Sequence, residues 1–322
     1  MPQQQPTFSI LIPTSGRAEL IRMAVRSALD QTCGDFEIVI ADLSGAPDTR
    51  HAATGSGDPR IRYFHTPGQG IATWDIAAKE ARGQYVLWLD DDNYLLPFAL
   101  DFFKKAIKKS GAEIITANHF YYYDNHQPRH FLRQSLGIIP FTGKESSIDL
   151  SKALREIYAF SRRGAGSELP RFHFSATVIS RQVIQRALDR LGFVLLGGMP
   201  NIHSLQPILF PFAKTCFFVD YPVVIVGRLG VSMSQIWSTA ARGRFAKTPF
   251  RPTHSPVIGY TRINGILENY LRVQRLLPDL LDKFPINYER FAERYMRELS
   301  LLDADPVTTA RFWKNFFSFV NT

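Results

Sequence analysis

The segment Tyr85–Pro97, which reads YVLWLDDDNYLLP, constrains the fold of this chain more than any other. Residues 85–89 form an unbroken apolar and aromatic run, the pattern of a strand that is buried on both faces. Three carboxylates, Asp90, Asp91 and Asp92, follow at once. Such strands are typical of α/β proteins, in which ligands bind beyond the carboxyl ends of the strands. We therefore expect an α/β fold with a ligand site at this strand end.

The crowding of three carboxylates predicts a cation. Carboxylates at the end of a buried strand repel one another and lose solvation. A hard divalent ion such as Mg2+ or Mn2+ relieves both effects, and such ions are often shared between carboxylates and substrate phosphates. The alternative is a solvated, Asp-rich turn that caps the following helix. The sequence favours the metal site.

Strand and helix patterns alternate along the first part of the chain. Strands are expected at residues 8–12, 36–41, 61–64, 85–89 and 113–117, and helices at 18–30 (with Ser15 as N-cap), 71–81 and 97–109. Residues 43–60, rich in Gly, Pro, Asp and Ser, are expected to be loop or an irregular helix. The alternation predicts a doubly wound sheet with helices on both faces.

The pattern loosens beyond Asn118. We expect antiparallel strands at 120–123 and 130–132, strands at 172–179 and 217–226, and a helix at 181–191. Amphipathic segments such as 266–277 and 288–302 predict a helical C-terminal region.

Composition limits the partners. The 322 residues carry 38 basic and 29 acidic side chains, a net charge of +9, which favours phosphorylated substrates, acidic glycans or an anionic membrane surface. No zinc-ligand spacing or nucleic-acid motif occurs, so nucleic acid is not an expected partner. Two cysteines fit a reducing cytosol. With no signal-peptide pattern and no apolar run of membrane length, we expect a cytoplasmic protein, with peripheral contact at the inner face of the membrane as the alternative.

Several motifs in order resemble family 2 glycosyltransferases of the GT-A fold. They are a strand leading into PTSGR, a helix, then DQT..DFEIVIAD, a later glycine, and finally YVLWLDDDN...P. The resemblance is strong over residues 8–100 and continues weakly through 173–234. It implies a metal-dependent, inverting transfer of a sugar from a nucleoside-diphosphate sugar to an unidentified acceptor in cell-surface polysaccharide, glycolipid or protein-glycan synthesis.

The resemblance also implies an organisation. The expected fold is a GT-A (Rossmann-like) mixed sheet flanked by helices, with a mainly helical C-terminal extension. Residues 1–118 would form the nucleotide-sugar-binding half of the GT-A domain and residues 119–234 the acceptor-binding half. A basic loop and the helical region would occupy residues 235–322.

Matching the family's motifs residue by residue implies a donor site. Asp90 and Asp92 match the first and last acids of the DxD motif, which binds Mn2+ or Mg2+, and Asp91 lies where family members contact the donor sugar or ribose. The other matched donor-binding positions are Pro13, Thr14 and Arg17 in the first loop, Asp42 after the second strand, and Gly70 and Asp75 in the segment that faces the donor.

Two departures from the family pattern leave specificity open. Leu43 stands where many members carry an acid that recognises the nucleobase, and Trp74 replaces a frequent Arg or Asn.

Asn201, in GGMPNIHS, stands near the family's catalytic Asp, but an amide has no useful basic site. His203 is therefore the candidate base, since an unperturbed imidazole pKa of about 6.5 suits proton transfer. The alternative is an inert, hydrogen-bonded His203.

Three further features keep more than one interpretation. No acid lies between Asp220 and Glu268, and the interval holds a basic run of Arg228, Arg242, Arg244, Lys247, Arg251 and Arg262. This run is a solvated face, a mobile lid over the diphosphate, or a patch for an anionic membrane or acceptor. His173 is a structural hydrogen-bonded residue or an active-site one, and the aromatic residues 120–123 are core or a sugar-stacking surface.

Three functional classes follow. A glycosyltransferase is favoured by the ordered motif set. A catalytically impaired sugar-nucleotide or glycan-binding protein on the same scaffold is the alternative that Leu43 and Asn201 raise. A nucleotidyltransferase would also use carboxylate-bound metal, but its glycine-rich phosphate loop is missing near the first strand.

Overall fold

The computed structural model describes residues 5–70, 72–126, 130–161, 172–195, 204–229, 253–257 and 261–300, together with residues 310 and 314. Ten strands of this part of the chain form one mixed sheet in the order β3-β2-β1-β4-β9-β6-β10-β5, with β7 paired to β6 and β8 to β10. The strands are β1 (Phe8–Thr14), β2 (Phe36–Asp42), β3 (Ile61–His65), β4 (Tyr85–Trp88), β5 (Tyr94–Leu95), β6 (Ile114–Tyr123), β7 (Ser135–Gly137), β8 (Glu145–Ile148), β9 (Thr177–Ser180) and β10 (Cys216–Arg228).

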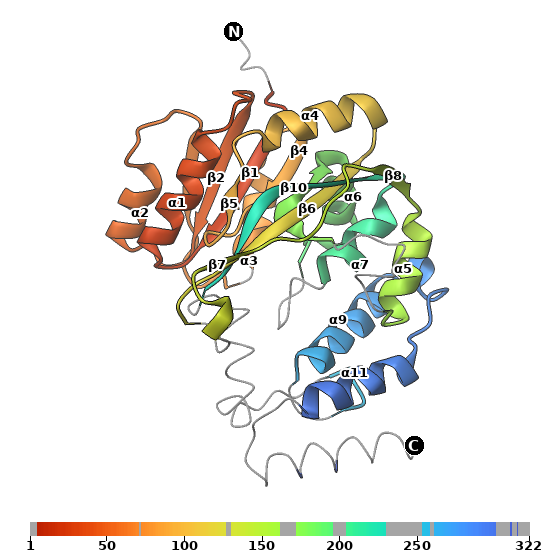
Figure 1. Ribbon diagram of the computed structural model, residues 1–322. Helices are drawn as coiled ribbons and strands as arrows, with labels where there is room; N and C mark the ends of the chain where they lie inside the picture. Colours follow the sequence, from red (N-terminus) through yellow and green to blue (C-terminus); the bar gives the residue numbers. More distant parts are fainter. Residues whose placement is uncertain are drawn as a thin grey trace. The chain divides into compact units, whose positions relative to one another are not determined.

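Helices flank this sheet and make up the C-terminal region (Figure 1). The α-helices are α1 (Ala18–Leu29), α2 (Pro47–Thr54), α3 (Ala72–Glu80), α4 (Ala99–Ser110), α5 (Leu150–Tyr158), α6 (Arg181–Leu191), α7 (Leu205–Leu209), α9 (Arg262–Leu276), α10 (Pro278–Leu281) and α11 (Tyr288–Ser300), and the 3-10 helices are η1 (His130–Leu132), η2 (Phe174–Ala176) and η4 (Phe210–Phe212). The mixed sheet flanked by helices and the helical C-terminal region are both confirmed.

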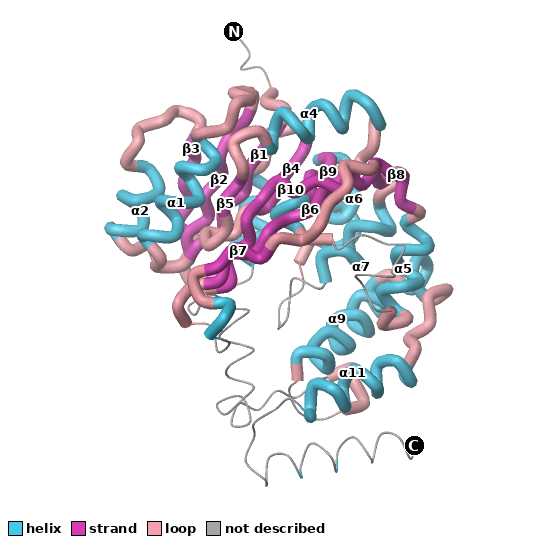
Figure 2. The backbone as a smooth tube through the Cα atoms, in the orientation of Figure 1, coloured by secondary structure: helices cyan, strands magenta, loops and turns pink. Residues whose placement is uncertain are grey.

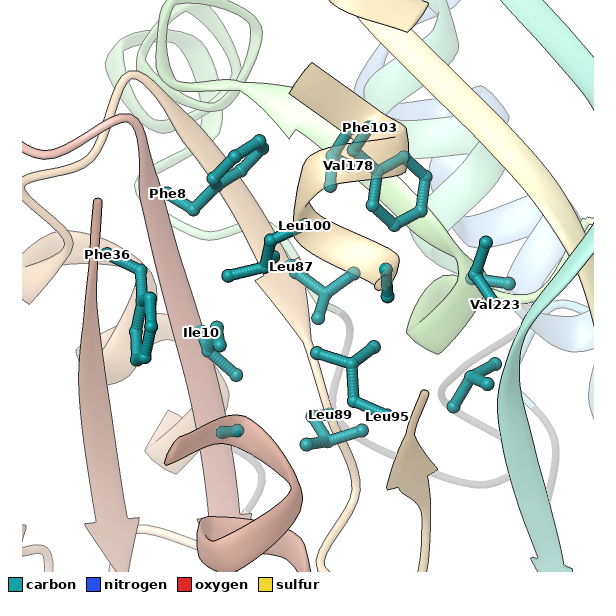
Figure 3. Packing of buried hydrophobic residues seen from close by; sticks show 14 of the residues in the cluster. Phe8, Ile10, Phe36, Leu87, Leu89, Leu95, Leu100, Phe103, Val178 and Val223 are labelled. Carbon is teal, nitrogen blue, oxygen red and sulfur yellow. The ribbon is translucent and has the colours of Figure 1, made fainter. Parts of the chain in front are cut away.

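The parallel part of the sheet follows from the long apolar strands. β3, β2, β1 and β4 run side by side (Figure 2), with Phe8 opposite Phe36 on one side and opposite Tyr85 on the other. Because successive side chains of a strand point to opposite faces, alternate residues meet different helices. One face packs against the apolar stripes of α1 and α4, and Leu100 and Phe103 of α4 lie beside Leu87 and Val178 (Figure 3).

The second half of the sheet differs from expectation at three places. Residues 120–123 continue β6, because β10 follows them in parallel register beyond an irregularity at Pro222. Their antiparallel partner is β7, whereas residues 130–132 form η1. The predicted strand 172–179 is shorter in the structure: η2 comes first and β9 follows it. His173 caps η2, because its Nδ1 accepts a hydrogen bond from the Ser175 amide.

Two helix predictions are also refined. The N-cap position of α1 is Arg17, without a side-chain capping bond, so Ser15 is not the cap. Gly16, between Ser15 and the cap, has a left-handed φ of +65°. In the region expected to be loop or irregular helix, Pro47 begins α2.

The chain divides into two compact units. The first comprises residues 1–150, 163–194 and 212–230, and holds the whole sheet. The second comprises residues 151–162, 195–211 and 231–322, and holds α5, α7 and α9–α11. The three functional segments expected from the sequence remain predictions, and their boundary at residue 118 falls within β6.

Candidate active site

The site is built where three parallel strands of the first unit end. Thr14 at the end of β1 is opposite Asp42 at the end of β2, and Leu89 donates its amide to Leu11, which extends the pairing of β4 with β1. Residues 90–93, here called the acid loop, therefore leave the sheet beside the end of β1. Tertiary pairing places the first loop and the acid loop at one edge, as the sequence predicts.

Asp91 joins these two loops. Its buried carboxylate accepts a hydrogen bond from Thr14 Oγ1 at 2.6 Å and one from Arg17 Nε at 3.0 Å, and a second Arg17 nitrogen forms an ion pair with it. Burial raises the pKa of Asp91, while Arg17 and Thr14 oppose this rise. A two-pronged arginine contact of this kind fixes geometry as well as charge. Thus Thr14, Arg17 and Asp91 form one preassembled unit.

Asp90 and Asp92 are in a different electrostatic position. Within the described part of the chain, neither carboxylate forms an ion pair with Lys, Arg or His. Burial, and then the charges of Asp92 and Asp91, raise the pKa of Asp90 well above its usual value. Burial and the charge of Asp91 raise the pKa of Asp92 to about 6, although Arg17 and Arg228 partly oppose this. Both side chains would gain from a nearby cation.

These two carboxylates fit a divalent metal that substrate phosphates complete. Among the residues that the structure describes, no group of three or more His, Cys, Asp or Glu side chains is arranged to hold a metal. Mg2+ commonly takes only one or two carboxylates, with water and phosphate oxygens as its other ligands. Asp91 is already paired with Arg17, whereas Asp90 and Asp92 have raised pKa values and form no ion pair in the described chain, so these two residues suit such an ion.

Asp42 is fully buried and bonded inside the protein. Its carboxylate accepts hydrogen bonds from the Ser44 amide at 2.9 Å, Ser44 Oγ at 2.8 Å, the Gly45 amide at 3.2 Å and the Tyr63 hydroxyl at 2.6 Å. Burial and this bond to Asp42 raise the pKa of Tyr63. The structure thus places Asp42 at the predicted edge, where it shapes the turn after β2.

The other sequence-predicted donor residues lie in β1, in the loop before α3 and in α3 itself. Pro13 is in β1, opposite Ala41. Gly70, with φ of +51°, ends the loop before α3. Asp75 in α3 is buried and accepts the Val194 amide at 2.7 Å. Its bond ties α3 to the segment after α6.

Trp74 and Arg228 add contacts close to the site. The Trp74 ring stacks on Trp88 of β4, with 6.4 Å between ring centroids, and meets Phe174 edge-on at 5.4 Å. The Arg228 guanidinium lies 4.7 Å from the centre of the Tyr121 ring. Desolvation, then the neighbouring His119 and Arg228, lower the pKa of His173 well below its usual value, so its ring is neutral at physiological pH.

Sequence reasoning missed a set of residues whose hydrogen bonds connect the acid loop to η2 and β10. They are Asn93, Ser175 and Gly227, joined by side-chain and backbone hydrogen bonds. The three positions are far apart in the chain, and no local pattern connects them. Their shared role is visible only in the assembled sheet.

Some sequence predictions fall outside the described residues. These are the catalytic candidates Asn201 and His203 and most of the basic run, from Arg242 to Arg251. In the segments that the structure does describe, no helix has the length and apolar character needed to cross a membrane.

Comparison with known proteins gives a consistent family. The family model of glycosyl transferase family 2 matches residues 9–186. Chondroitin synthase of Pasteurella multocida is 36% identical over 107 residues, which is 32% of this chain and 11% of that protein. The GalNAc(5)-diNAcBac-PP-undecaprenol beta-1,3-glucosyltransferase of Campylobacter jejuni is 33% identical over 100 residues, 30% of this chain and 32% of that protein. This chain thus spans about a third or less of these relatives.

Solved structures support the fold. The crystal structure of S. aureus TarS 1-349 in complex with UDP-GlcNAc superposes with a TM-score of 0.57 and 15% sequence identity. The match covers 92% of this chain and 73% of that one. At this identity the likeness concerns the fold alone.

Proposed function

Because the chain belongs to glycosyl transferase family 2, we propose that it transfers a sugar from a nucleoside-diphosphate sugar to an acceptor, with a divalent metal and with inversion at the sugar. One observation carries this proposal. The acid loop presents two carboxylates, Asp90 and Asp92, that form no ion pair within the described chain, next to the preassembled Thr14–Arg17–Asp91 unit. The divalent metal that accompanies a donor diphosphate would supply positive charge beside these carboxylates.

The donor side of the proposal uses the first loop and its neighbours. Pro13, Thr14 and Arg17 would border the nucleotide, and Asp91 would act by fixing Arg17 and Thr14 in place. Asp42 would act in the same manner on residues 43–45. Gly70 and Asp75 would face the donor from the segment that begins α3. The nucleobase is left open, since Leu43 supplies no acid.

Mn2+ or Mg2+, held by Asp90 and Asp92, would act as a Lewis acid that stabilises negative charge on the departing diphosphate. The chain's own part is to hold both carboxylates side by side in the acid loop, and binding of the ion would favour their deprotonated form. The burial that raises their pKa values also weakens competition from water for the ion.

An inverting transfer needs a base on the far face of the sugar to accept the acceptor's proton. We propose His203 for this role, on the resemblance of residues 197–204 to the family's base region. His203→Ala should then lose transfer but keep donor binding, and the native rate should fall as pH drops through the imidazole pKa. Unchanged transfer by His203→Ala would exclude His203. Activity gained by Asn201→Asp would indicate an impaired natural enzyme.

The acceptor belongs to the same proposal. The two relatives act, by their names, in chondroitin synthesis and on an undecaprenol-linked saccharide. An extracellular polysaccharide or a lipid-linked glycan is therefore the proposed acceptor class. Contact of the basic run with an anionic membrane would bring the enzyme to a lipid-linked acceptor, and salt-sensitive sedimentation with anionic vesicles tests that contact.

The central experiment is release of nucleoside diphosphate from a panel of sugar nucleotides, with Mn2+, with Mg2+ and in chelator. Metal-dependent release is expected with one donor or a few. Release of pyrophosphate instead would indicate a nucleotidyltransferase. Binding without turnover would favour a sugar-nucleotide-binding protein, and full activity in chelator would exclude the metal.

A further inference from the structure

Asn93, the residue after the three acids, has a side chain that is hydrogen-bonded at both ends of its amide. It is buried, and its amide spans two elements that come from distant parts of the chain. Asn93 Nδ2 donates to Ser175 Oγ of η2 at 2.8 Å, and Asn93 Oδ1 accepts the Gly227 amide of β10 at 3.0 Å.

The partners fix the orientation of this amide. A backbone N–H can only donate, so Gly227 must face the oxygen Oδ1, which leaves Nδ2 for the Ser175 hydroxyl. Ser175 is itself held, because it is fully buried and its amide donates to His173 Nδ1 at 3.2 Å. Both arms of Asn93 therefore end on rigid parts of the sheet unit.

Gly227 adds a steric contact to the hydrogen bond. A Cβ atom at this position would lie 2.2 Å from the carbonyl oxygen of Asp92 and 3.3 Å from the Asp92 Cβ. The backbone of β10 thus packs directly on the backbone of Asp92, at a distance that only glycine permits. The backbone of Asp92 therefore contacts β10 directly. The next residue, Asn93, is hydrogen-bonded to both β10 and η2.

We propose that Asn93 is a positioning residue: its amide clamps the acid loop between η2 and the end of β10 and thereby sets the Asp90 and Asp92 carboxylates for their ligand. The inference rests on the proposed metal site. Asn suits this position because one side chain must both donate and accept, and because a neutral group adds no fourth negative charge to the loop.

The first measurement uses Mn2+ alone as the probe, with free Mn2+ followed by electron paramagnetic resonance. Asn93→Ala should weaken Mn2+ binding by about tenfold or more, by analogy with the loss of outer-shell groups in metal sites. Asn93→Gln is the conservative variant. It keeps a neutral amide that can both donate and accept, so it should bind Mn2+ more tightly than Asn93→Ala does without adding a charge near the ion.

Asn264 is the matched control, since it is another buried amide that bridges two segments. It accepts a hydrogen bond from Ser255 Oγ, and its Nδ2 donates to the Val257 carbonyl at 2.8 Å. Asn264→Ala should lower the melting temperature and leave Mn2+ affinity within about threefold, whereas Asn93→Ala should change affinity beyond any effect of its lost stability.

Hydrogen exchange tests the clamp without any ligand. In Asn93→Ala the Gly227 amide should exchange faster, and in Ser175→Ala, which removes one arm only, the increase should be smaller. Ser175→Ala also keeps the test informative if Asn93→Ala does not fold. Native Mn2+ affinity or unchanged Gly227 exchange in Asn93→Ala would overturn the clamp. Absence of Mn2+ binding by the natural protein would instead overturn the metal site, and the positioning role with it.

Discussion

Two carboxylate sites in this molecule, one in each compact unit, differ in how far the protein's own donors satisfy their charge. The first is the acid loop. The second, which we call the Glu268 anchor, consists of Glu268 in α9 and residues 253–255. Glu268 accepts the amides of Thr253, His254 and Ser255 at 3.2, 2.9 and 2.7 Å and the Thr253 hydroxyl at 2.8 Å. Burial alone would raise its pKa, but these donors outweigh burial and lower the pKa to about 2.

Asp90 and Asp92 of the acid loop are half-buried, and neither forms an ion pair within the described chain. Burial and then the charge of Asp91 raise the pKa of Asp92 to about 6, and burial and then the charges of Asp92 and Asp91 raise the pKa of Asp90 well above its usual value. The comparison teaches how to separate a structural acid from a functional one. A carboxylate that the protein's own donors satisfy acts as an anchor, as Asp42 and Glu268 do, whereas one that forms no ion pair in the described chain suits the proposed cation.

The largest expected effect separates the two sites by activity. Asp90→Asn and Asp92→Asn should each lower kcat/KM by about a hundredfold or more, the scale of losing a transition-state charge contact. Glu268→Gln should leave kcat/KM of the folded protein nearly unchanged. Steady-state assays with the donor identified in the panel measure this, with Asp48→Asn, an exposed acid of α2, as the control. An equal loss of kcat/KM in Asp48→Asn and Asp92→Asn would show that the acid loop has no special role in activity.

Substitution in the Glu268 anchor should lower stability more than substitution in the acid loop does. Glu268→Ala leaves three backbone amides without their acceptor and should lower the free energy of unfolding by about 2–4 kcal/mol. Urea denaturation measures the change, and Glu289→Ala on the exposed side of α11 provides the control. A loss no larger than that of Glu289→Ala would show that the anchor contributes little.

The pH dependence of stability should differ in sign between the sites. In chelator, the native pKa of Asp92, about 6 against its usual 3.8, means that its contribution is complete below pH 3.8 and is lost as pH rises through 6. Asp92→Asn should therefore gain about 1–3 kcal/mol over the natural protein at pH 8 and nothing at pH 3.8. The contribution of Glu268 is present above pH 4.5 and is lost as pH falls toward 2. The free energy of unfolding of Asp92→Asn and of Glu268→Gln, each relative to the natural protein, should therefore change with pH in opposite directions. The same direction for both variants would contradict this assignment.

The smallest effect is stabilisation by metal. Mn2+ at about ten times its dissociation constant should add about 1.4 kcal/mol to the natural protein, because it binds only the native state. A thermal-shift titration should show this rise in Glu268→Gln as well, and no rise in the double variant Asp90→Asn/Asp92→Asn. A rise that survives in the double variant would place the ion elsewhere.

The parallel strands and most helices were predictable from local patterns, since burial on both faces leaves an unbroken apolar run and amphipathic helices leave a 3.6-residue repeat. The helix α6 lies at residues 181–191 as predicted. Irregular strands were harder. β10 was predicted at residues 217–226 and spans Cys216–Arg228, but its partners were not predicted, because the register shifts at Pro222. β5 has two residues, too few for a pattern.

The sequence by itself determined which residues carry charge at the site, because Asp90–Asp92 directly follow a strand whose end must lie at the carboxyl edge of the sheet. Only the tertiary structure decided how these acids differ. Arg17, brought by the first loop, pairs with Asp91 and not with its neighbours. Asn93, Ser175 and Gly227 meet because β9 and β10 insert beside β4 and β6. Solvation and hydrogen-bond partners depend on which distant segments surround a side chain, and a linear pattern does not contain that information.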